Sequence, residues 1–208
     1  RGFPVYVIAE IGINPNGSLE TALELVDVAA DAGCDAVKFQ KRTPSICVPP
    51  EQRQLRRETP WGNLTYLQYK ERIELSRDDY QVISERCSER GIEWFASPWD
   101  RESVSFLEDF GVPCHKVASA SLTDLDLLKA IRDTGRPVIL STGMSTLEEI
   151  DAAVDTLGTT SLVLAQSTST YPAKPHQLNL RAMATLRDRY QRPVGYSGHE
   201  TGLQTTVA

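Results

Sequence analysis

Short apolar, β-branched runs alternate with longer amphipathic segments along the whole chain. We expect the runs to form strands, and the amphipathic segments, several of which open with Ser, Thr or Asp and close with Gly, to form helices. The predicted strands are Val5–Glu10, Ala36–Gln40, Ile92–Ala96, His115–Ala118, Pro137–Ser141, Leu162–Gln166 and Pro193–Ser197. The predicted helices include Ser18–Ala32, Arg77–Arg90, Asp100–Asp109, Thr123–Asp133 and Thr146–Thr156.

Seven successive strand-then-helix units predict a parallel sheet, and therefore an α/β fold. Their number favours a (β/α)8 TIM barrel over the alternative, a doubly wound open sheet. We expect one barrel domain over residues 1–208 that lacks the last β/α unit, because the chain stops in the expected seventh helix, Thr205–Ala208. This leaves room for a further domain. The longest connection, residues 42–76, is rich in proline and is expected to be a lid or a partner contact.

Composition narrows the classes of function. The 208 residues are 40% hydrophobic and carry a net charge of -6 with no long basic cluster, which argues against a nucleic-acid partner. No apolar run is long enough for a signal peptide or a membrane span. The four cysteines form no C-x-x-C pair, so we expect reduced thiols in a cytoplasmic enzyme.

Two lysines interrupt strand-like apolar runs. Lys38 lies in D-A-V-K-F-Q-K and Lys116 in H-K-V-A-S. Because side chains alternate along a strand, Lys38 and Gln40 share one face, while Val37 and Phe39 face the helices. Lys38 is therefore expected to point into the barrel.

Every predicted strand ends in polar residues, and barrel enzymes build their sites at the carboxyl ends of their strands. Besides the two lysines, the hydroxyls in these positions belong to Ser97, Ser119, Ser141, Ser169 and Ser197. Together they form a ring of donors with almost no acceptor charge. That inventory predicts a site for phosphate or carboxylate.

Each residue also has a structural explanation. A strand lysine can lie at a sheet edge, and Ser141 with Thr142 can serve as a helix cap. His199 can be a structural histidine, and Glu10 can form a structural ion pair with one lysine. The occurrence of all these residues at the same end of successive strands favours a functional site.

The ordered set of strand-end motifs resembles the sialic acid synthase (N-acetylneuraminate synthase) family over nearly the whole chain. The motifs are A-E-I-G-I-N from Ala9, V-K-F-Q from Val37, A-S-P-W-D from Ala96, K-V-A-S from Lys116, L-S-T-G-M from Leu140, S-T-Y-P from Ser169 and V-G-Y-S-G-H-E from Val194.

The resemblance implies a (β/α)8 enzyme that condenses phosphoenolpyruvate with an N-acyl hexosamine such as N-acetylmannosamine. The products are a nine-carbon 2-keto acid and phosphate. The residues it assigns to phosphoenolpyruvate are Lys38, Ser97, Lys116, Ser119, Ser141, Ser169 and Ser197. Glu10, Tyr171, Lys38 and Lys116 are the expected catalytic residues, and Gln40 and Asn63 the expected sugar contacts.

The resemblance also implies a divalent metal, Mn²⁺ or Mg²⁺, with His199 as one of two histidine ligands. The second ligand is expected in the eighth strand, beyond Ala208. Many family members carry a C-terminal antifreeze-like domain that reaches into the site of the partner subunit, so a homodimer is expected.

Two departures from the family pattern bear on specificity. Asn14-Pro15-Asn16-Gly17 stands where the family usually has Asn-His-x-Gly, and Gln166-Ser167 where many relatives have His-Cys. Two other functions stay open. One is a Schiff-base aldolase in which Lys116 or Lys38 forms an imine with a keto acid. The other is a barrel that only binds a sugar or an anion.

Overall fold

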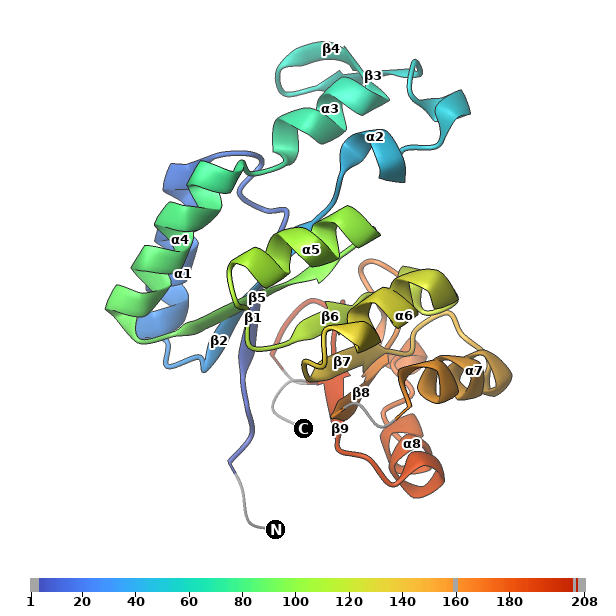
Figure 1. Ribbon diagram of the computed structural model, residues 1–208. Coiled ribbons are helices and arrows are strands. Elements are labelled where there is room, and N and C mark those ends of the chain that lie inside the picture. Colours follow the sequence, from blue (N-terminus) through green and yellow to red (C-terminus); the bar gives the residue numbers. More distant parts are fainter. Residues whose placement is uncertain (1–3, 159–160, 204, 206–208) are drawn as a thin grey trace. The chain divides into compact units, whose positions relative to one another are not determined.

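The computed structural model describes residues 4–158, 161–203 and 205 (Figure 1). The chain divides into two compact units, residues 1–113 and 114–208. Each unit contains a parallel sheet with helices between successive strands. The α/β class is confirmed, whereas closure into a (β/α)8 barrel and a single domain over residues 1–208 stay predictions. Within the described residues, no helix combines the length and apolar character needed to cross a bilayer.

The first unit is built around β2, which pairs in parallel with β1 on one side and β5 on the other. Its elements in chain order are β1 (Ile8–Gly12), α1 (Leu19–Asp31), β2 (Ala36–Lys41), α2 (Pro44–Cys47), η1 (Pro50–Gln52), β3 (Arg56–Thr59), β4 (Gly62–Thr65), α3 (Tyr66–Ile73), α4 (Arg77–Arg90), β5 (Glu93–Pro98) and α5 (Arg101–Asp109). Helices α1 and α4 pack against each other.

Local chemistry sets the ends of α4, which has the predicted bounds. The Ser76 hydroxyl accepts a hydrogen bond from the Asp79 N–H, and the Asp79 carboxylate accepts one from the Ser76 N–H. This capping box satisfies two of the free donors at the helix start. Gly91 ends the helix with a φ of 65°, a left-handed conformation that glycine adopts without strain. The first strand, in contrast, begins at Ile8 rather than Val5, and Val5 is largely exposed.

The apolar face of β2 packs against aromatic side chains. Val37 and Phe39 are fully buried, and the Phe39 ring makes edge-to-face contacts with Tyr80 of α4 and Trp94 of β5. This confirms the predicted alternation, because residues one position away must then lie on the other face. Lys38 is one of them.

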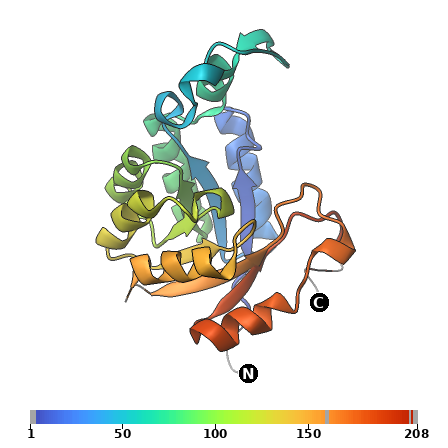
Figure 2. The same ribbon diagram turned by 90° about the vertical axis from the view of Figure 1, so that its right-hand side faces the viewer.

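The connection between β2 and α4 is more ordered than the sequence pattern predicts. It contains α2, η1, the antiparallel β3–β4 hairpin and α3, and it stands beyond the end of β2 in both views (Figures 1 and 2). The strands of the hairpin are four residues long and mostly exposed. Their sequence therefore lacks the apolar alternation by which a strand is identified.

The second unit has four parallel strands in the order β6, β7, β8 and β9. Its elements in chain order are β6 (His115–Val117), η2 (Ser119–Ser121), α6 (Leu125–Asp133), β7 (Val138–Ser141), α7 (Leu147–Leu157), β8 (Leu162–Ser167), η3 (Pro175–Gln177), α8 (Ala182–Tyr190) and β9 (Val194–Ser197). Helix α8 was not predicted, and Leu186 is its one buried residue. The expected helix Thr205–Ala208 lies, apart from Thr205, outside the described residues.

Candidate active site

In the first unit, the side chains predicted to face the barrel interior form a cluster at the carboxyl ends of the strands. The Lys38 Nζ lies 2.7 Å from the Glu10 Oε2 and donates a hydrogen bond of 3.0 Å to the Ser97 Oγ. Lys38 is only 7% exposed, whereas about half of the Glu10 side chain is exposed. The buried ammonium thus has two partners on one side of the sheet.

The ion pair corrects one part of the sequence interpretation. The predicted ring of donors had almost no acceptor charge, whereas the Glu10 carboxylate lies directly beside Lys38. Glu10 and Lys38 are opposite each other in the parallel pairing of β1 and β2, and a register shift follows between Glu10 and Gly12. Directly paired residues of neighbouring strands point to the same face of the sheet. Glu10 therefore does form the ion pair that was the structural alternative, with its carboxylate still reaching solvent.

The second unit repeats the arrangement of the first. The Lys116 Nζ donates to the Ser141 Oγ, and both residues are buried. In each unit the lysine is opposite the residue two positions before the serine: Lys38 pairs with Phe95 ahead of Ser97, and Lys116 with Ile139 ahead of Ser141. Each lysine also lies within hydrogen-bond distance of the carbonyl of the next residue in its own strand. Both units therefore present a buried cation beside a hydroxyl at a strand end.

The turn after β7 brings two further predicted serines together around Gly143. Its N–H donates to the Ser119 Oγ over 3.1 Å. A β-carbon at Gly143 would lie 2.7 Å from the Ser169 Oγ and 2.8 Å from the Ser119 Oγ. The Ser169 Oγ is buried and has no hydrogen-bond partner among the described residues. A buried hydroxyl normally has a partner, so this one is suited to a ligand oxygen.

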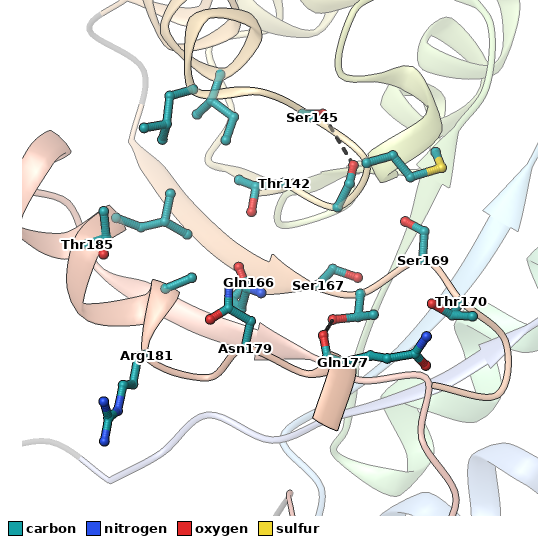
Figure 3. Close-up of a pocket in the computed structure, with 17 residues that line it drawn as sticks. Thr142, Ser145, Gln166, Ser167, Ser169, Thr170, Gln177, Asn179, Arg181 and Thr185 are labelled. Atoms are coloured by element: carbon teal, nitrogen blue, oxygen red, sulfur yellow. Dashed lines mark hydrogen bonds between the residues drawn. The ribbon is translucent and has the colours of Figure 1, made fainter. Parts of the chain in front are cut away.

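Gly143 and Ser169 line a cavity of about 790 Å³ in the second unit (Figure 3). Its lining comes from the turn after β7, from the start of α7, from the end of β8 with the loop that follows, and from α8. Ser167, named above only as a departure from the family pattern, lines it with a buried hydroxyl that has no partner in the described part of the chain. Among the described residues of the lining, Arg181 is the only charged one. The cavity therefore suits a polar ligand.

His199 lies just after β9, and the backbone determines which of its nitrogens carries the proton. Its Nδ1 is 2.7 Å from the Thr168 carbonyl oxygen. Because a carbonyl only accepts, Nδ1 carries the hydrogen, and in the neutral ring Nε2 is the nitrogen with the lone pair. This is the usual arrangement of a metal-binding histidine. The described residues contain no group of three His, Cys, Asp or Glu side chains that would hold a metal, so His199 fits as a single ligand and the full set is not assembled here.

Two more predicted residues lie near His199 in the fold. The Tyr171 ring is 5.3 Å from the His199 ring and is largely exposed. Ser197 is opposite Ser167 in the pairing of β8 and β9. Glu200, which sequence reasoning left without a role, accepts a 2.7 Å hydrogen bond from the Tyr196 hydroxyl. Burial favours a higher pKa for Glu200, but this bond and others outweigh it and lower the pKa, so the carboxylate stays ionised.

Asn63 differs from the other predicted residues in its surroundings. It lies in β4 on the exposed hairpin, where its amide donates to Glu58 and accepts from Arg56. These local partners occupy the amide, so the prediction of a sugar contact at Asn63 gains no support. Pro15, the departure in the first motif, is buried in the turn after β1.

Parallel strands with buried cations and hydroxyls at their carboxyl ends are typical of α/β proteins that bind anionic ligands there. Residues 25–208 match the NeuB family, and the chain belongs to that family.

Named relatives give this family a reaction type. The chain is 37% identical to N,N'-diacetyllegionaminic acid synthase of Legionella pneumophila, with 95% of this chain and 58% of that protein aligned. It is 35% identical to N-acetylneuraminate-9-phosphate synthase of Drosophila melanogaster over 96% of this chain and 55% of that protein. The chain thus spans little more than half the length of these relatives. The crystal structure of N-acetylneuraminic acid (sialic acid) synthetase from Leptospira borgpetersenii has a TM-score of 0.88 at 31% identity and covers 98% of this chain and 68% of that chain.

Proposed function

We propose that this protein condenses phosphoenolpyruvate with an N-acyl hexosamine, similar to N-acetylmannosamine, to form a nine-carbon 2-keto sugar acid and phosphate. The product is sialic acid or a related nonulosonate. The observation that carries the proposal is the buried lysine–serine pair that both units repeat at their strand ends. The synthases named above support it, and the proposal includes closure into a (β/α)8 barrel in the complete protein.

Phosphoenolpyruvate carries a phosphate and a carboxylate, and the chain offers charge-assisted donors to both. In this proposal the ammonium groups of Lys38 and Lys116 bind its oxygens, together with serine hydroxyls. Those hydroxyls belong to Ser97, Ser119, Ser141, Ser169 and Ser197. The space beside Gly143 supports this role, because two of the hydroxyls converge where a side chain would otherwise stand.

The reaction balances with water as the third reactant. A carbon–carbon bond forms between C3 of phosphoenolpyruvate and the aldehyde carbon of the open-chain sugar. Water adds to C2, the bond from C2 to the phosphate oxygen breaks, and inorganic phosphate leaves as the ketone forms. Glu10 holds or relays a proton at the water or at the aldehyde oxygen, since its carboxylate is partly exposed beside Lys38. Gln40 contacts the sugar.

His199 and Tyr171 serve the same site in this proposal. The free Nε2 of His199 holds one position of a divalent ion, Mn²⁺ or Mg²⁺, which when bound supplies a Lewis acid.

We also propose that the complete protein is a cytoplasmic homodimer. Cys34, Cys47 and Cys87 are free thiols, which supports a reducing compartment.

The test is a panel of N-acyl hexosamines with phosphoenolpyruvate and Mn²⁺ or Mg²⁺, using the full-length protein. Phosphate release and product mass are measured together. The proposal expects stoichiometric phosphate and a nine-carbon keto acid with at least one acceptor. Absence of phosphate with every acceptor, or a borohydride-trapped pyruvate adduct at Lys38 or Lys116, would contradict it.

A further inference from the structure

The Gln40 side chain has its orientation imposed by a neighbouring guanidinium. The Arg42 Nη2 donates to the Gln40 Oε1 over 2.5 Å. Arginine has only donors, so the amide oxygen must face Arg42 and the amide nitrogen must face away. The Gln40 Nε2 lies 3.5 Å from the point that a β-carbon on Gly12 would occupy, and the Glu10 Oε1 lies 2.9 Å from the same point. The amide donor and the carboxylate therefore face one place beside Gly12.

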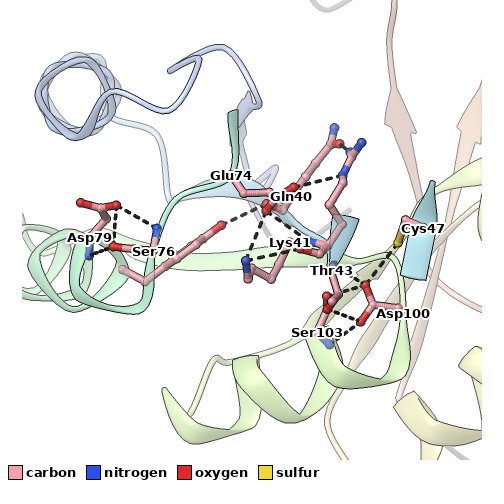
Figure 4. Close-up of polar contacts among 11 residues, drawn as sticks. Gln40, Lys41, Thr43, Cys47, Glu74, Ser76, Asp79, Asp100 and Ser103 are labelled. Atoms are coloured by element: carbon pink, nitrogen blue, oxygen red, sulfur yellow. Dashed lines mark hydrogen bonds and ion pairs between the residues drawn. The ribbon is translucent and has the colours of Figure 1, made fainter. Parts of the chain in front are cut away.

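Arg42 is itself held on several sides. It is 8% exposed, and its Nε lies 3.3 Å from the Glu74 Oε1. Its guanidinium carbon lies 4.6 Å from the centre of the Trp99 ring, a cation–π distance. Lys41 adds a second ion pair to Glu74, and Glu74, Gln40 and Lys41 lie together in Figure 4. A guanidinium with this many partners cannot swing away from Gln40 without breaking them.

The Gln40 backbone is restrained as well. The Tyr80 hydroxyl, from α4, donates to the Gln40 carbonyl oxygen over 3.0 Å. Gln40 follows Lys38 by two residues in β2, the spacing that puts strand side chains on one face, and Arg42 comes just after the end of this strand. Gln40 is thus held at its backbone carbonyl and at its side-chain oxygen. Only the N–H groups of its side-chain amide are left to donate to a ligand.

We infer that Arg42 is a positioning residue that makes the Gln40 side chain an obligatory hydrogen-bond donor. The amino sugar then binds to the Gln40 N–H groups through an acceptor oxygen. The inference rests on the proposed function and adds the polarity of one sugar contact. Loss of Arg42 would let the amide rotate and present its oxygen, which repels an acceptor. Binding of the sugar should then weaken while binding of phosphoenolpyruvate does not change.

The experiment is a double-mutant cycle in the full-length protein with Arg42→Met, Gln40→Ala and the combined variant. Kinetic constants are measured separately for the amino sugar and for phosphoenolpyruvate. We expect R42M to raise the sugar KM about tenfold, the effect of one well-placed hydrogen bond, with the phosphoenolpyruvate KM within about twofold of wild type. In the Q40A background the same change should have almost no further effect. Arg57→Met, which removes an exposed arginine of the hairpin, is the matched control.

Additive effects of R42M and Q40A, or an equal rise in both KM values, would overturn the role of Arg42. If R42M fails to fold by thermal melting, Arg42→Lys replaces it, since it keeps a cation near Glu74 but lacks the planar fork that holds the amide. Wild-type protein without phosphoenolpyruvate-dependent phosphate release would overturn the proposed function and this role with it. Wild-type turnover with an additive cycle would overturn this role alone.

Discussion

The carboxylate of Glu10 and the ammonium of Lys38 form an ion pair of 2.7 Å across the β1–β2 pairing, with one partner exposed and the other buried. Burying an unpaired ammonium raises the free energy of the folded state. The ion pair with Glu10 and the hydrogen bond to Ser97 offset this desolvation cost in the absence of a ligand. At Lys116 the Ser141 hydroxyl accepts a hydrogen bond from the ammonium. Each buried ammonium thus has a hydrogen-bond partner within its own unit, and in the proposed function it also binds an anion.

Replacing either lysine should impair the use of phosphoenolpyruvate. Lys38→Met and Lys116→Met keep the length of the side chain but remove a charge-assisted hydrogen bond of about 1.5–3 kcal/mol. We expect kcat/KM for phosphoenolpyruvate to fall about 10- to 100-fold in each variant. Steady-state phosphate release measures it, with Lys129→Met, an exposed lysine of α6, as the control. Wild-type kinetics in either variant would exclude that lysine from the site.

The space beside Gly143 gives a second prediction. In Gly143→Ala the new methyl group would meet two serine oxygens at under 3 Å, so it should displace a bound phosphate or carboxylate. We expect at least a tenfold rise in the KM for phosphoenolpyruvate, the cost of about 1.4 kcal/mol of binding. Gly195→Ala is the matched control, because a β-carbon there has no atom within 4 Å. Equal behaviour of the two variants would count against the proposed anion site.

Removal of His199 should weaken metal binding specifically. His199→Ala deletes the nitrogen that the Thr168 carbonyl orients, and we expect the affinity of the full-length apoprotein for Mn²⁺ to fall at least about tenfold. Titration calorimetry with MnCl₂ measures it. His176→Ala, an exposed histidine in η3, should bind Mn²⁺ as the wild type does. Unchanged affinity in the His199 variant would remove this residue from the metal site.

Asp100 should make the stability of the first unit depend on acid pH. Its carboxylate accepts hydrogen bonds from the Thr43 and Ser103 N–H groups, at 2.7 and 2.8 Å. Burial favours a higher pKa, but these bonds and others outweigh it and lower the pKa of Asp100. Because the folded pKa lies below the unfolded value, the stabilisation is complete above the unfolded pKa and is lost as pH falls through the folded one.

Asp100→Asn replaces one of these acceptors with a donor and should lower the free energy of unfolding at pH 7 by about 1–3 kcal/mol. Urea denaturation at several pH values measures the difference, which should shrink as the pH drops below about 4. Asp133→Asn, at an exposed position, should change little at any pH. A constant difference between wild type and D100N across this range would show that the carboxylate charge is not the cause.

Much of the fold could be predicted because periodicity and caps are local. The α4 bounds follow from Ser76 and Gly91, and the direction of Lys38 follows from the buried Val37 and Phe39 beside it. The β3–β4 hairpin and α8 were missed, since their stability comes from neighbours rather than from an apolar stripe of their own. Leu186 is the one buried residue of α8.

For the site, the sequence by itself determined which residues stand at the carboxyl ends of the strands, because chain order and strand alternation are enough to place them. Only the tertiary structure decided which of those groups meet. The pairing that sets Glu10 beside Lys38, the approach of Ser119 and Ser169 to Gly143, and the bond from Arg42 to Gln40 all depend on register and packing. Most of these contacts join residues that are far apart in the sequence. A local sequence pattern therefore cannot predict them.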